Sequence, residues 1–380
     1  MIKLALNATS LLSPLTGIGQ YTRNLALELM KLGEVDLDFF YSSGWSKNLY
    51  TSPSHTKSNL VSKIKPFIPF AYELRRFWHR YNFSTYANDH TFNIYHEPNY
   101  LLMPFNGPSV VTIHDLSWLN YPEMHPTARV RALNAYFPRS LQTATLIITD
   151  SEFIKQEVVR TFSINPSRIE AIPLGVEETF SPKTDTESKA TLPQYGMRHN
   201  SYFLTVGTFE PRKILQLALT AYQALPSSLR KHYPLVIVGM KGWHTHKLQH
   251  AMNSLVNSGE IRLLGYIPRH DLAMITAGAT TLVYPSVYEG FGLPPLEAMA
   301  CAVPPIVSDA SSLPEVVAGG GIKISPSNAD ALSIAMQQLA EDLPYQKKLG
   351  VQALARAQEL TWQQCAKHTY HLYQRAISLY

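Results

Sequence analysis

Short apolar runs alternate with longer amphipathic stretches along nearly the whole chain. The runs are rich in β-branched residues and almost continuously apolar, which is typical of parallel strands that are buried on both faces. In the first half we expect strands at residues 2–8, 36–41, 94–96, 110–114 and 145–150. Helical periodicity between several of these runs predicts helices at residues 20–31, 128–141 and 152–162.

The same alternation restarts near residue 200. We expect strands at residues 202–206, 235–238, 261–264, 281–284 and 305–308, and later helices at 329–339, 345–360 and from 363 to the end. Two successive Rossmann-like, doubly wound parallel-sheet domains explain this repetition, so the predicted fold class is α/β. The polar stretch 181–200 is the expected linker, which gives domains of residues 1–180 and 181–362.

The composition is that of a globular chain. Of its 380 residues, 45% are apolar and 16% are charged, which suffices for two domains with their own cores. A formal charge of +5 favours an anionic ligand or an anionic membrane surface, but it is too small to indicate nucleic acid. Cys301 and Cys365 are far apart, so we expect no disulfide framework and a reducing, cytoplasmic setting. No apolar stretch approaches the roughly 20 residues that span a bilayer.

The most informative motif is EGFGLPPLE, which runs from Glu289 to Glu297 just after the expected strand 281–284. Gly290 and Gly292 let backbone N–H groups approach an anion, and the prolines begin a helix with a positive N-terminus. The two carboxylates can accept hydrogen bonds from hydroxyls, which a sugar-nucleotide carries on both sides of its diphosphate. The motif therefore predicts a sugar-nucleotide site; the alternative is a plain helix start with an exposed Glu297.

The segment GTFEPRK, from Gly207 to Lys213, directly follows the expected strand 202–206. In an open α/β sheet a diphosphate binds at the carboxyl ends of the strands. Arg212 offers planar, bidentate donors, and Lys213 offers a compact point charge. Two cations at a helix start oppose the helix dipole, which favours a ligand role over a solvated pair.

Two further candidates lie in the first domain. His114 ends the strand 110–114, where it could carry a proton or bind a sugar hydroxyl, with Asp115 orienting its ring. The alternative is a core histidine with satisfied hydrogen bonds. Gly17 and Gly19 lie in a predicted loop before the first helix, which resembles a phosphate-binding turn but lacks a third glycine. A plain turn is the alternative there.

We expect no bound metal ion. Asp36 and Asp38 have the spacing of a metal-binding pair, but they lie on one face of an expected interior strand and are interpreted as surface carboxylates.

The segment from Val61 to Phe83 interleaves lysine and arginine with phenylalanine, tyrosine and tryptophan. This mixture is typical of a surface that contacts anionic lipid. An amphipathic helix packed on its own domain is an equally good interpretation.

Four segments together resemble glycosyltransferase family 4: TGIGQYTRNL from Thr16, HDL from His114, GTFEPRK from Gly207, and EGFGLPPLEAMA from Glu289. They occur in the family's order over nearly the whole chain. The resemblance implies a retaining sugar-nucleotide transferase with the GT-B fold, in which an acceptor-side domain and a nucleotide-sugar-binding domain face a central cleft. It also implies that helix 363–380 packs back on the first domain. Many members carry Asn where Ile214 stands and Gly where Ala302 stands.

The resemblance also implies roles for matching residues. Glu289 would hold donor-sugar hydroxyls, and Glu297 would hold the ribose hydroxyls. Arg212 and Lys213 would bind the diphosphate, and His114 would contact the sugar near the reacting carbon. His114, Arg212, Lys213 and Glu289 are therefore the catalytic candidates. The remaining donor-binding candidates are Gly17, Gly19, Gly207, Tyr266, Ile267, Gly290, Phe291, Gly292 and Leu293, with Tyr266 and Ile267 at the base.

The combination of TGIGQY with GTFEPRK is similar to bacterial mannosyl- and rhamnosyltransferases of O-antigen and other surface polysaccharides. This similarity implies transfer of mannose or rhamnose from a GDP-sugar to a lipid-linked, polyprenyl-diphosphate acceptor, without a metal cofactor. The setting would be the cytoplasm or the cytoplasmic face of the inner membrane. Two alternatives stay open, namely a nucleotide-sugar epimerase on the same scaffold and a non-catalytic sugar-nucleotide-binding assembly protein.

Overall fold

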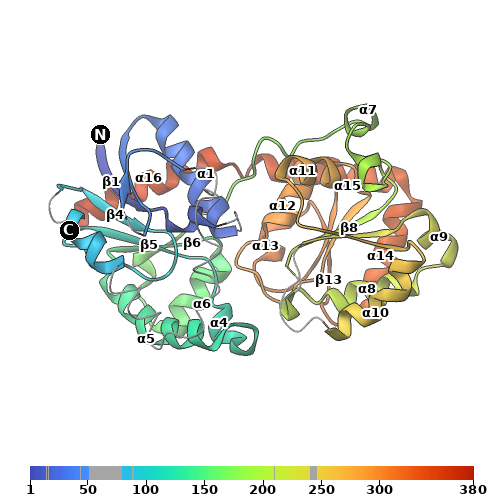
Figure 1. The fold of residues 1–380 in the computed structure, drawn as a ribbon, viewed down its shortest axis with the longest axis horizontal. Helices are drawn as coiled ribbons and strands as arrows, with labels where there is room; N and C mark the ends of the chain where they lie inside the picture. Colours follow the sequence, from blue (N-terminus) through green and yellow to red (C-terminus); the bar gives the residue numbers. More distant parts are fainter. Residues whose placement is uncertain are drawn as a thin grey trace, which may run out of the picture.

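The protein has two lobes, each with a sheet flanked by helices (Figure 1). The computed structural model describes residues 1–13, 15, 17–42, 44–50, 79–87, 90–208, 210–239 and 246–380. The chain passes from the first lobe to the second after the first sheet, and its last helix returns to the first lobe. The prediction of two doubly wound α/β units is confirmed.

The sheet of the first lobe has the strand order β3-β2-β1-β4-β5-β6-β7. Neighbouring strands are parallel, apart from the antiparallel pair β2 and β3. Leu4 of β1 lies opposite Leu37 of β2 and Ile94 of β4. The strands are β1 (Ile2–Asn7), β2 (Val35–Phe40), β3 (Trp45–Ser46), β4 (Ile94–Glu97), β5 (Ser109–Ile113), β6 (Leu146–Thr149) and β7 (Ile169–Ala171).

The sheet of the second lobe is parallel and has the order β10-β9-β8-β11-β12-β13. Its direction of winding reverses between β8 and β11, as it does between β1 and β4 in the first sheet. Such reversals open a crevice at the carboxyl ends of the strands, where open α/β sheets bind ligands. The strands are β8 (Phe203–Val206), β9 (Leu235–Val238), β10 (Ile261–Gly265), β11 (Thr281–Tyr284), β12 (Pro305–Ser308) and β13 (Ile322–Ile324).

In the first lobe, helix α6 begins at a side-chain cap. At α6, the side chain of Ser151 accepts a hydrogen bond from the backbone N–H of Ile154, and Glu152 adds a negative charge to the first turn. Residues 79–87 are also helical. The other elements are η1 (Thr9–Leu12), α1 (Gly17–Leu32), α4 (Ser117–Asn120), η3 (Pro122–Met124), α5 (Thr127–Thr143), α6 (Glu152–Phe162) and η4 (Pro166–Arg168).

In the second lobe, helices connect successive parallel strands. At α12, Gly292 has a φ of 109°, a conformation that favours glycine, and two prolines stand in the first turn. The elements are η6 (Pro211–Lys213), α8 (Leu215–Ala224), α9 (Ser227–His232), α10 (His246–Asn257), α11 (Arg269–Ala277), α12 (Leu293–Ala300), α13 (Leu313–Val317), α14 (Ala329–Glu341) and α15 (Leu343–Gln358).

Two segments of the expected pattern differ from the structure. The expected loop around Gly17 and Gly19 is the first turn of α1, which begins three residues earlier than its periodicity indicates. The expected linker 181–200 contains the short helix α7 (Asp185–Ser188) and the turn η5 (Leu192–Tyr195). Thr184 and Glu187 form a capping box that makes this polar stretch helical. How the chain divides into independently folding units stays a prediction.

The last helix, α16 (Trp362–Leu379), packs on α1 and contacts β4 and β5 of the first lobe (Figure 1). A buried hydrogen-bonded chain fastens it there. His96 on β4 contacts the Tyr373 hydroxyl of α16 at 2.7 Å and the Thr112 hydroxyl of β5 at 2.8 Å. Burial lowers the pKa of His96 to about 3, so the ring is neutral near pH 7.

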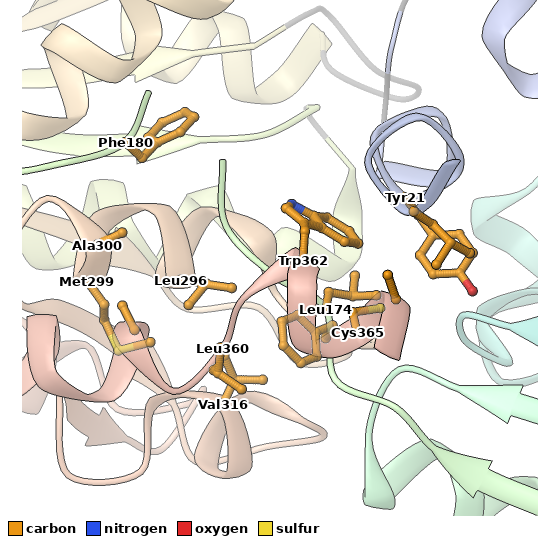
Figure 2. Close-up of a cluster of buried hydrophobic side chains, with 14 of the residues drawn as sticks. Tyr21, Leu174, Phe180, Leu296, Met299, Ala300, Val316, Leu360, Trp362 and Cys365 are labelled. Carbon is orange, nitrogen blue, oxygen red and sulfur yellow. The ribbon is translucent and has the colours of Figure 1, made fainter. Parts of the chain in front are cut away.

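An apolar core continues from one lobe into the other through the two connecting segments (Figure 2). Trp362 lies at this passage, with its ring 6.3 Å from that of Tyr21 and with Leu174 close by. A Cβ atom at Gly175 would lie 1.9 Å from the backbone nitrogen of Trp362, so only glycine fits where the connections touch. In the described part of the chain, no helix combines the length and the apolar character needed to cross a bilayer.

Candidate active site

The two strongest sequence motifs meet at the switch point of the second sheet. GTFEPRK follows β8, and EGFGLPPLE follows β11, its neighbour. Gly207 and Gly239 have φ values of 149° and 152°. A Cβ atom at Gly239 would lie 1.9 Å from the carbonyl oxygen of Gly207, so bare backbone is required at this crossing. A small cavity of about 20 Å³ beside Gly207 is lined by Lys213 and Tyr284, among others.

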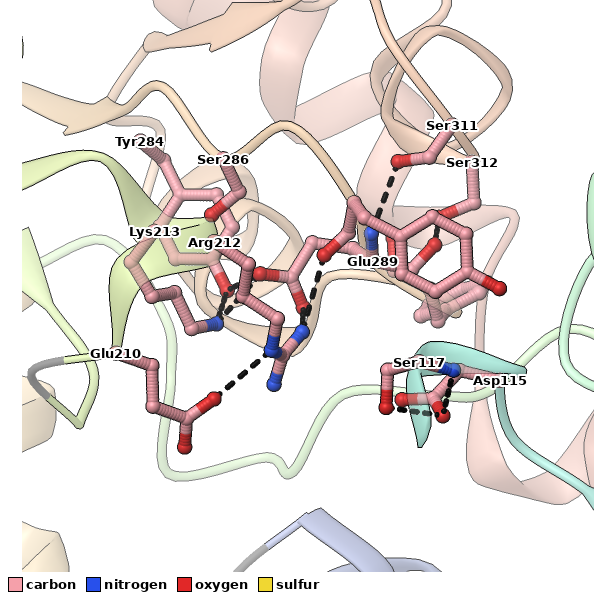
Figure 3. A network of polar contacts seen from close by, with 12 residues as sticks. Asp115, Ser117, Glu210, Arg212, Lys213, Tyr284, Ser286, Glu289, Ser311 and Ser312 are labelled. Carbon is pink, nitrogen blue, oxygen red and sulfur yellow. Dashed lines mark hydrogen bonds and ion pairs between the residues drawn. The ribbon is translucent and has the colours of Figure 1, made fainter. Parts of the chain in front are cut away.

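Glu289 is the centre of a polar cluster at this point (Figure 3). Lys213 Nζ lies 2.6 Å from Glu289 Oε1, and Arg212 Nη1 lies 3.1 Å from Oε2. The Tyr284 hydroxyl donates to Oε1 at 3.0 Å, and it also contacts Lys213. The backbone N–H of Glu289 donates to Ser311 Oγ at 3.0 Å. The predicted cations and carboxylate therefore lie in one cluster.

The charges in this cluster balance. Arg212 Nε contacts a second carboxylate, Glu210 Oε2, at 2.8 Å, so two acidic and two basic side chains lie together. Glu289 is buried, which by itself opposes its charged form. Lys213 and Arg212 outweigh that effect and lower the pKa of Glu289 to about 2. Glu289 is therefore ionised at neutral pH and holds both cations in place.

The glycine turn after Glu289 contacts the first lobe. A Cβ atom at Gly290 would lie 1.8 Å from the carbonyl oxygen of His114, so the two backbones touch there. Ser151 Oγ, at the start of α6, donates to the carbonyl of Gly290 at 2.8 Å. The Ser312 hydroxyl spans the carbonyls of Glu289 and Phe291 at 2.9 and 3.0 Å. The turn is thus held from both lobes.

Two more side chains of the second lobe reach the first. The Tyr288 hydroxyl accepts the backbone N–H of Leu116 at 2.9 Å and contacts the Glu157 carboxylate. The Glu315 carboxylate of α13 accepts two backbone N–H groups at the start of α6, those of residues 152 and 153, at 2.9 and 3.2 Å. A carboxylate at a helix N-terminus is favourable. These contacts hold the lobes together beside the Glu289 cluster.

His114 is buried, and both of its ring nitrogens face acceptors. Nδ1 lies 2.7 Å from Asp150 Oδ2, and Nε2 lies 2.8 Å from the carbonyl oxygen of Pro98. Two acceptors favour the charged form of the ring, in which both nitrogens carry hydrogen. Burial opposes that charge, but the Asp150 carboxylate outweighs it and raises the pKa of His114. The two contacts hold the ring in one orientation, and Asp150 stabilises its charged form.

The prediction that Asp115 orients the His114 ring is wrong. Asp115 instead accepts hydrogen bonds from the Tyr100 hydroxyl at 3.0 Å and the Ser117 hydroxyl at 2.8 Å. His114 and Asp115 follow the end of β5, and their side chains reach different partners. Asp150 follows the adjacent strand β6 and reaches the ring from the same edge of the sheet.

Glu297 lies apart from the Glu289 cluster, on the first turns of α12. The alternative interpretation of Glu297 as an exposed surface charge is wrong, because its side chain is buried and contacts Arg269 Nη2 at 2.6 Å.

The other donor-binding candidates differ in exposure. Gly17 is exposed, and Gly19 is buried in the first turn of α1. Tyr266 is 65% exposed and free to contact a ligand. Ile267 and Phe291 have buried side chains, and Leu293 is half-buried against the core.

Three expectations concern residues outside the Glu289 cluster, and that of no bound metal ion stays a prediction. Asp36 and Asp38 both contact Lys47 Nζ, at 2.7 and 2.9 Å, and Asp38 is buried, so the surface interpretation is wrong for Asp38. The described residues contain no group of three or more acidic, histidine or cysteine side chains placed to hold a metal ion. In the expected membrane-contacting segment, residues 61–78 lie outside the described part of the chain.

Sequence reasoning missed several residues that shape the site. Asp150, Tyr284 and Tyr288 were each inside an expected element or beside a motif, and the only available signal was their place at the carboxyl end of a strand. Arg269 directly follows the loop with Tyr266, and a cation at a helix start was a usable signal there.

Comparisons with known proteins agree with this arrangement. Residues 15–180 match the family model described as Glycosyltransferase Family 4, and residues 194–356 match that of Glycosyl transferases group 1. The chain is 35% identical to O-antigen chain mannosyltransferase B of Escherichia coli over 95% of its own length and 96% of that protein.

Solved structures show the same fold. A sucrose-phosphate synthase from Thermosynechococcus elongatus has a TM-score of 0.79 at 21% identity, with both chains covered completely. HepE of Anabaena, solved in complex with UDP and glucose, has a TM-score of 0.74 at 15% identity, with 99% of this chain and 100% of that chain covered. The two facing α/β lobes are therefore those of the GT-B fold.

Proposed function

The chain belongs to glycosyltransferase family 4, and from this premise we propose that it transfers mannose from GDP-mannose to a lipid-linked glycan in O-antigen synthesis. The observation that carries the proposal is the buried cluster of Glu289, Arg212 and Lys213 at the switch point of the second sheet, facing the first lobe. The similarity to an O-antigen chain mannosyltransferase supports the sugar and the pathway. GDP-rhamnose is the alternative donor, because related sequence patterns serve both sugars.

Donor binding would exchange one ion pair for another. In the free chain, Glu289 balances Lys213 and Arg212, so no charge is buried without a partner. The donor brings a diphosphate that can replace Glu289 beside the two cations. The oxygens of Glu289 then become free to accept hydrogen bonds from sugar hydroxyls. The carboxylate of Glu289 would thus bind the cations before the donor arrives and the sugar hydroxyls afterwards.

The proposed reaction proceeds with retention at the anomeric carbon. The bond between that carbon and the diphosphate oxygen breaks, and a bond to the acceptor oxygen forms on the same face. The acceptor proton passes to the departing diphosphate. Glu210 and Glu289 are each in contact with a cationic side chain, which disfavours attack by either carboxylate. Lys213 and Arg212 stabilise the charge that develops on the leaving GDP.

The remaining parts of the site have supporting roles in this proposal. His114 would contact the sugar rather than shuttle the acceptor proton, because both of its ring nitrogens are occupied. Contact between the lobes would exclude water and limit hydrolysis of the donor. Because Lys213 and Arg212 already supply positive charge to the diphosphate, we propose that no metal ion is needed. The basic and aromatic segment up to Phe83 supports an encounter with anionic lipid and a lipid-linked acceptor.

The proposal is tested by a transfer assay with purified full-length chain. Radiolabelled GDP-mannose, GDP-rhamnose and UDP-glucose are each supplied with a polyprenyl-diphosphate-linked oligosaccharide, with and without EDTA. We expect label to enter the lipid fraction from GDP-mannose, unaffected by EDTA. Conversion of donor to another sugar-nucleotide without acceptor would identify an epimerase, and no donor consumption in either setting would identify a binding protein. Either result would overturn the proposal.

A further inference from the structure

Arg269 connects the second carboxylate of the EGFGLPPLE motif to the segment that joins the lobes. It is the first residue of α11, directly after the loop that contains the exposed Tyr266. Its Nη2 lies 2.6 Å from Glu297 Oε1 and 2.9 Å from Glu177 Oε1, and its Nε lies 3.1 Å from the same Glu177 oxygen. One guanidinium therefore bridges two carboxylates from distant parts of the chain.

The position of Arg269 is unfavourable without these partners. A cation in the first turn of a helix opposes the helix dipole. The Glu297 side chain is only 5% exposed, whereas that of Arg269 is 31% exposed. A carboxylate that is this deeply buried requires a charged or hydrogen-bonding partner. Arg269 supplies that partner from the solvent side, where it also borders the loop with Tyr266.

The contact occupies only one oxygen of Glu297. In the part of the chain that the structure describes, Oε1 accepts from Arg269, and no hydrogen bond reaches Oε2. The planar guanidinium fixes the carboxylate plane through Oε1 and leaves Oε2 as an acceptor. A pair of neighbouring hydroxyls is a suitable partner for such an oxygen.

The other side of Arg269 is anchored on the connection between β7 and β8. Glu177 and Phe180 both lie there, and the guanidinium carbon lies 4.4 Å from the centre of the Phe180 ring. Cation–aromatic contacts of this kind are attractive. The backbone N–H of the preceding residue, Val176, donates to the carbonyl of Leu360 at 3.3 Å. Arg269 is thus held at the place where both connections between the lobes pass each other.

We propose that Arg269 is a positioning residue that orients Glu297 for the ribose hydroxyls of the donor nucleotide, with Glu177 as its anchor. This inference rests on the proposed function, because it takes the nucleotide to bind along α12. Arg269 itself need not touch the nucleotide. Its effect would be to keep Glu297 in one orientation before the nucleotide arrives, so that less ordering accompanies binding.

The test measures how strongly the protein distinguishes nucleotides with and without ribose hydroxyls. Dissociation constants of GDP and 2′,3′-dideoxy-GDP are determined on the same preparation by calorimetry, so an inactive fraction cancels from their ratio. In the wild type we expect GDP to bind about tenfold or more tightly, since hydrogen bonds to a charged acceptor are strong. Arg269→Gln should reduce this ratio to about that of Glu297→Gln. Arg269→Lys should restore part of it, and Glu177→Gln should lower it less.

His270→Gln, at the exposed next position of α11, is the matched control and should keep the wild-type ratio. A wild-type ratio in Arg269→Gln or, if that variant does not fold, in Arg269→Lys together with Glu177→Gln would overturn the inference and leave the proposed function intact. The same measurement with UDP and 2′,3′-dideoxy-UDP covers a different base, because the ribose is shared. If neither nucleotide binds the wild type, both the proposed function and this inference fail.

Discussion

At the scale of single residues, Glu289 shows how two cationic side chains keep a buried carboxylate ionised. Its carboxylate is buried, yet both of its oxygens contact cations, and its pKa is lowered to about 2. A group whose pKa is lower in the folded state contributes stability above its unfolded pKa, which is about 4.3 for glutamate. That contribution is lost as the pH falls through the folded value. The charge of this carboxylate therefore contributes to stability at neutral pH and not in strong acid.

We predict that Glu289→Gln destabilises the protein at pH 7 by about 2–3 kcal/mol, because Lys213 and Arg212 lose their charged partner. The wild type should lose this advantage between about pH 4.5 and pH 2, so the two stability curves converge in acid. Urea denaturation at a series of pH values measures the effect. Glu341→Gln, at an exposed position of α14, is the control and should follow the wild type. A constant difference between the Glu289→Gln and wild-type curves down to pH 2 would contradict the assignment.

At the residue scale, the sequence identified those groups that follow a strand in a recognisable motif. Arg212, Lys213 and Glu289 belong to this class, and they do lie together. Asp150 and Arg269 were not assigned, because neither lies in a recognisable motif, and their partners are 36 and 28 positions away. Only the arrangement of strands brings such pairs into contact. The sequence likewise did not show which groups contact the His114 ring, because Asp150 and Pro98 are distant from it along the chain.

At the scale of single elements, the backbone is strained at the residue before α8. Ile214 precedes the helix with a φ of 41°, and Ala302, after α12, has a φ of 58°. The family resemblance implies Asn and Gly at these two positions, and these residues tolerate left-handed backbone best. A β-branched side chain is especially poor there, and Ile214 provides no cap for α8.

Ile214→Asn should therefore raise the free energy of unfolding by about 1 kcal/mol, because it relieves backbone strain and supplies a side-chain cap for α8. The substitution removes some apolar contact, which limits the gain. Urea denaturation provides the measurement. Ile214→Val, which keeps the branched side chain and adds no cap, should show no gain. Equal stabilities of the asparagine and valine variants would refute this explanation.

Periodicity predicted most of the long elements, because a buried strand or an amphipathic helix has a pattern of its own. It was less successful at the ends of elements. The helix α1 begins at Gly17, although glycine is a weak helix former and its apolar pattern starts only at residue 20. The short α7 was hidden in a polar stretch, where its capping box was the only local signal.

For the whole molecule, the decisive feature is direct backbone contact between the lobes beside the site. Gly290 touches the carbonyl of His114, Tyr288 contacts Leu116, and Glu315 caps α6. None of these contacts was apparent in the sequence. The pattern of strands and helices predicted two lobes but not the surfaces through which they touch. They place the polar groups of the first lobe next to the cations of the second.

Gly290→Ala should prevent this contact, because its Cβ atom would lie 1.8 Å from the His114 oxygen. We expect each lobe to stay folded and transfer to fall about a hundredfold, as for other small displacements of reacting groups. Circular dichroism and initial transfer rates distinguish these effects. Gly319→Ala is the control, since nothing lies within 4 Å of its added methyl group. Unchanged transfer by the Gly290→Ala variant would show that lobe contact at this turn is dispensable.

The central claim is that Lys213 and Glu289 act together on the donor beside the contact between the lobes. The most direct measurement is the turnover of purified Lys213→Ala and Glu289→Ala with saturating GDP-mannose and lipid-linked acceptor. We predict a folded protein in each case and a loss of about a hundredfold or more in kcat, because each group stabilises charge during transfer. Wild-type turnover in both folded variants would contradict the account.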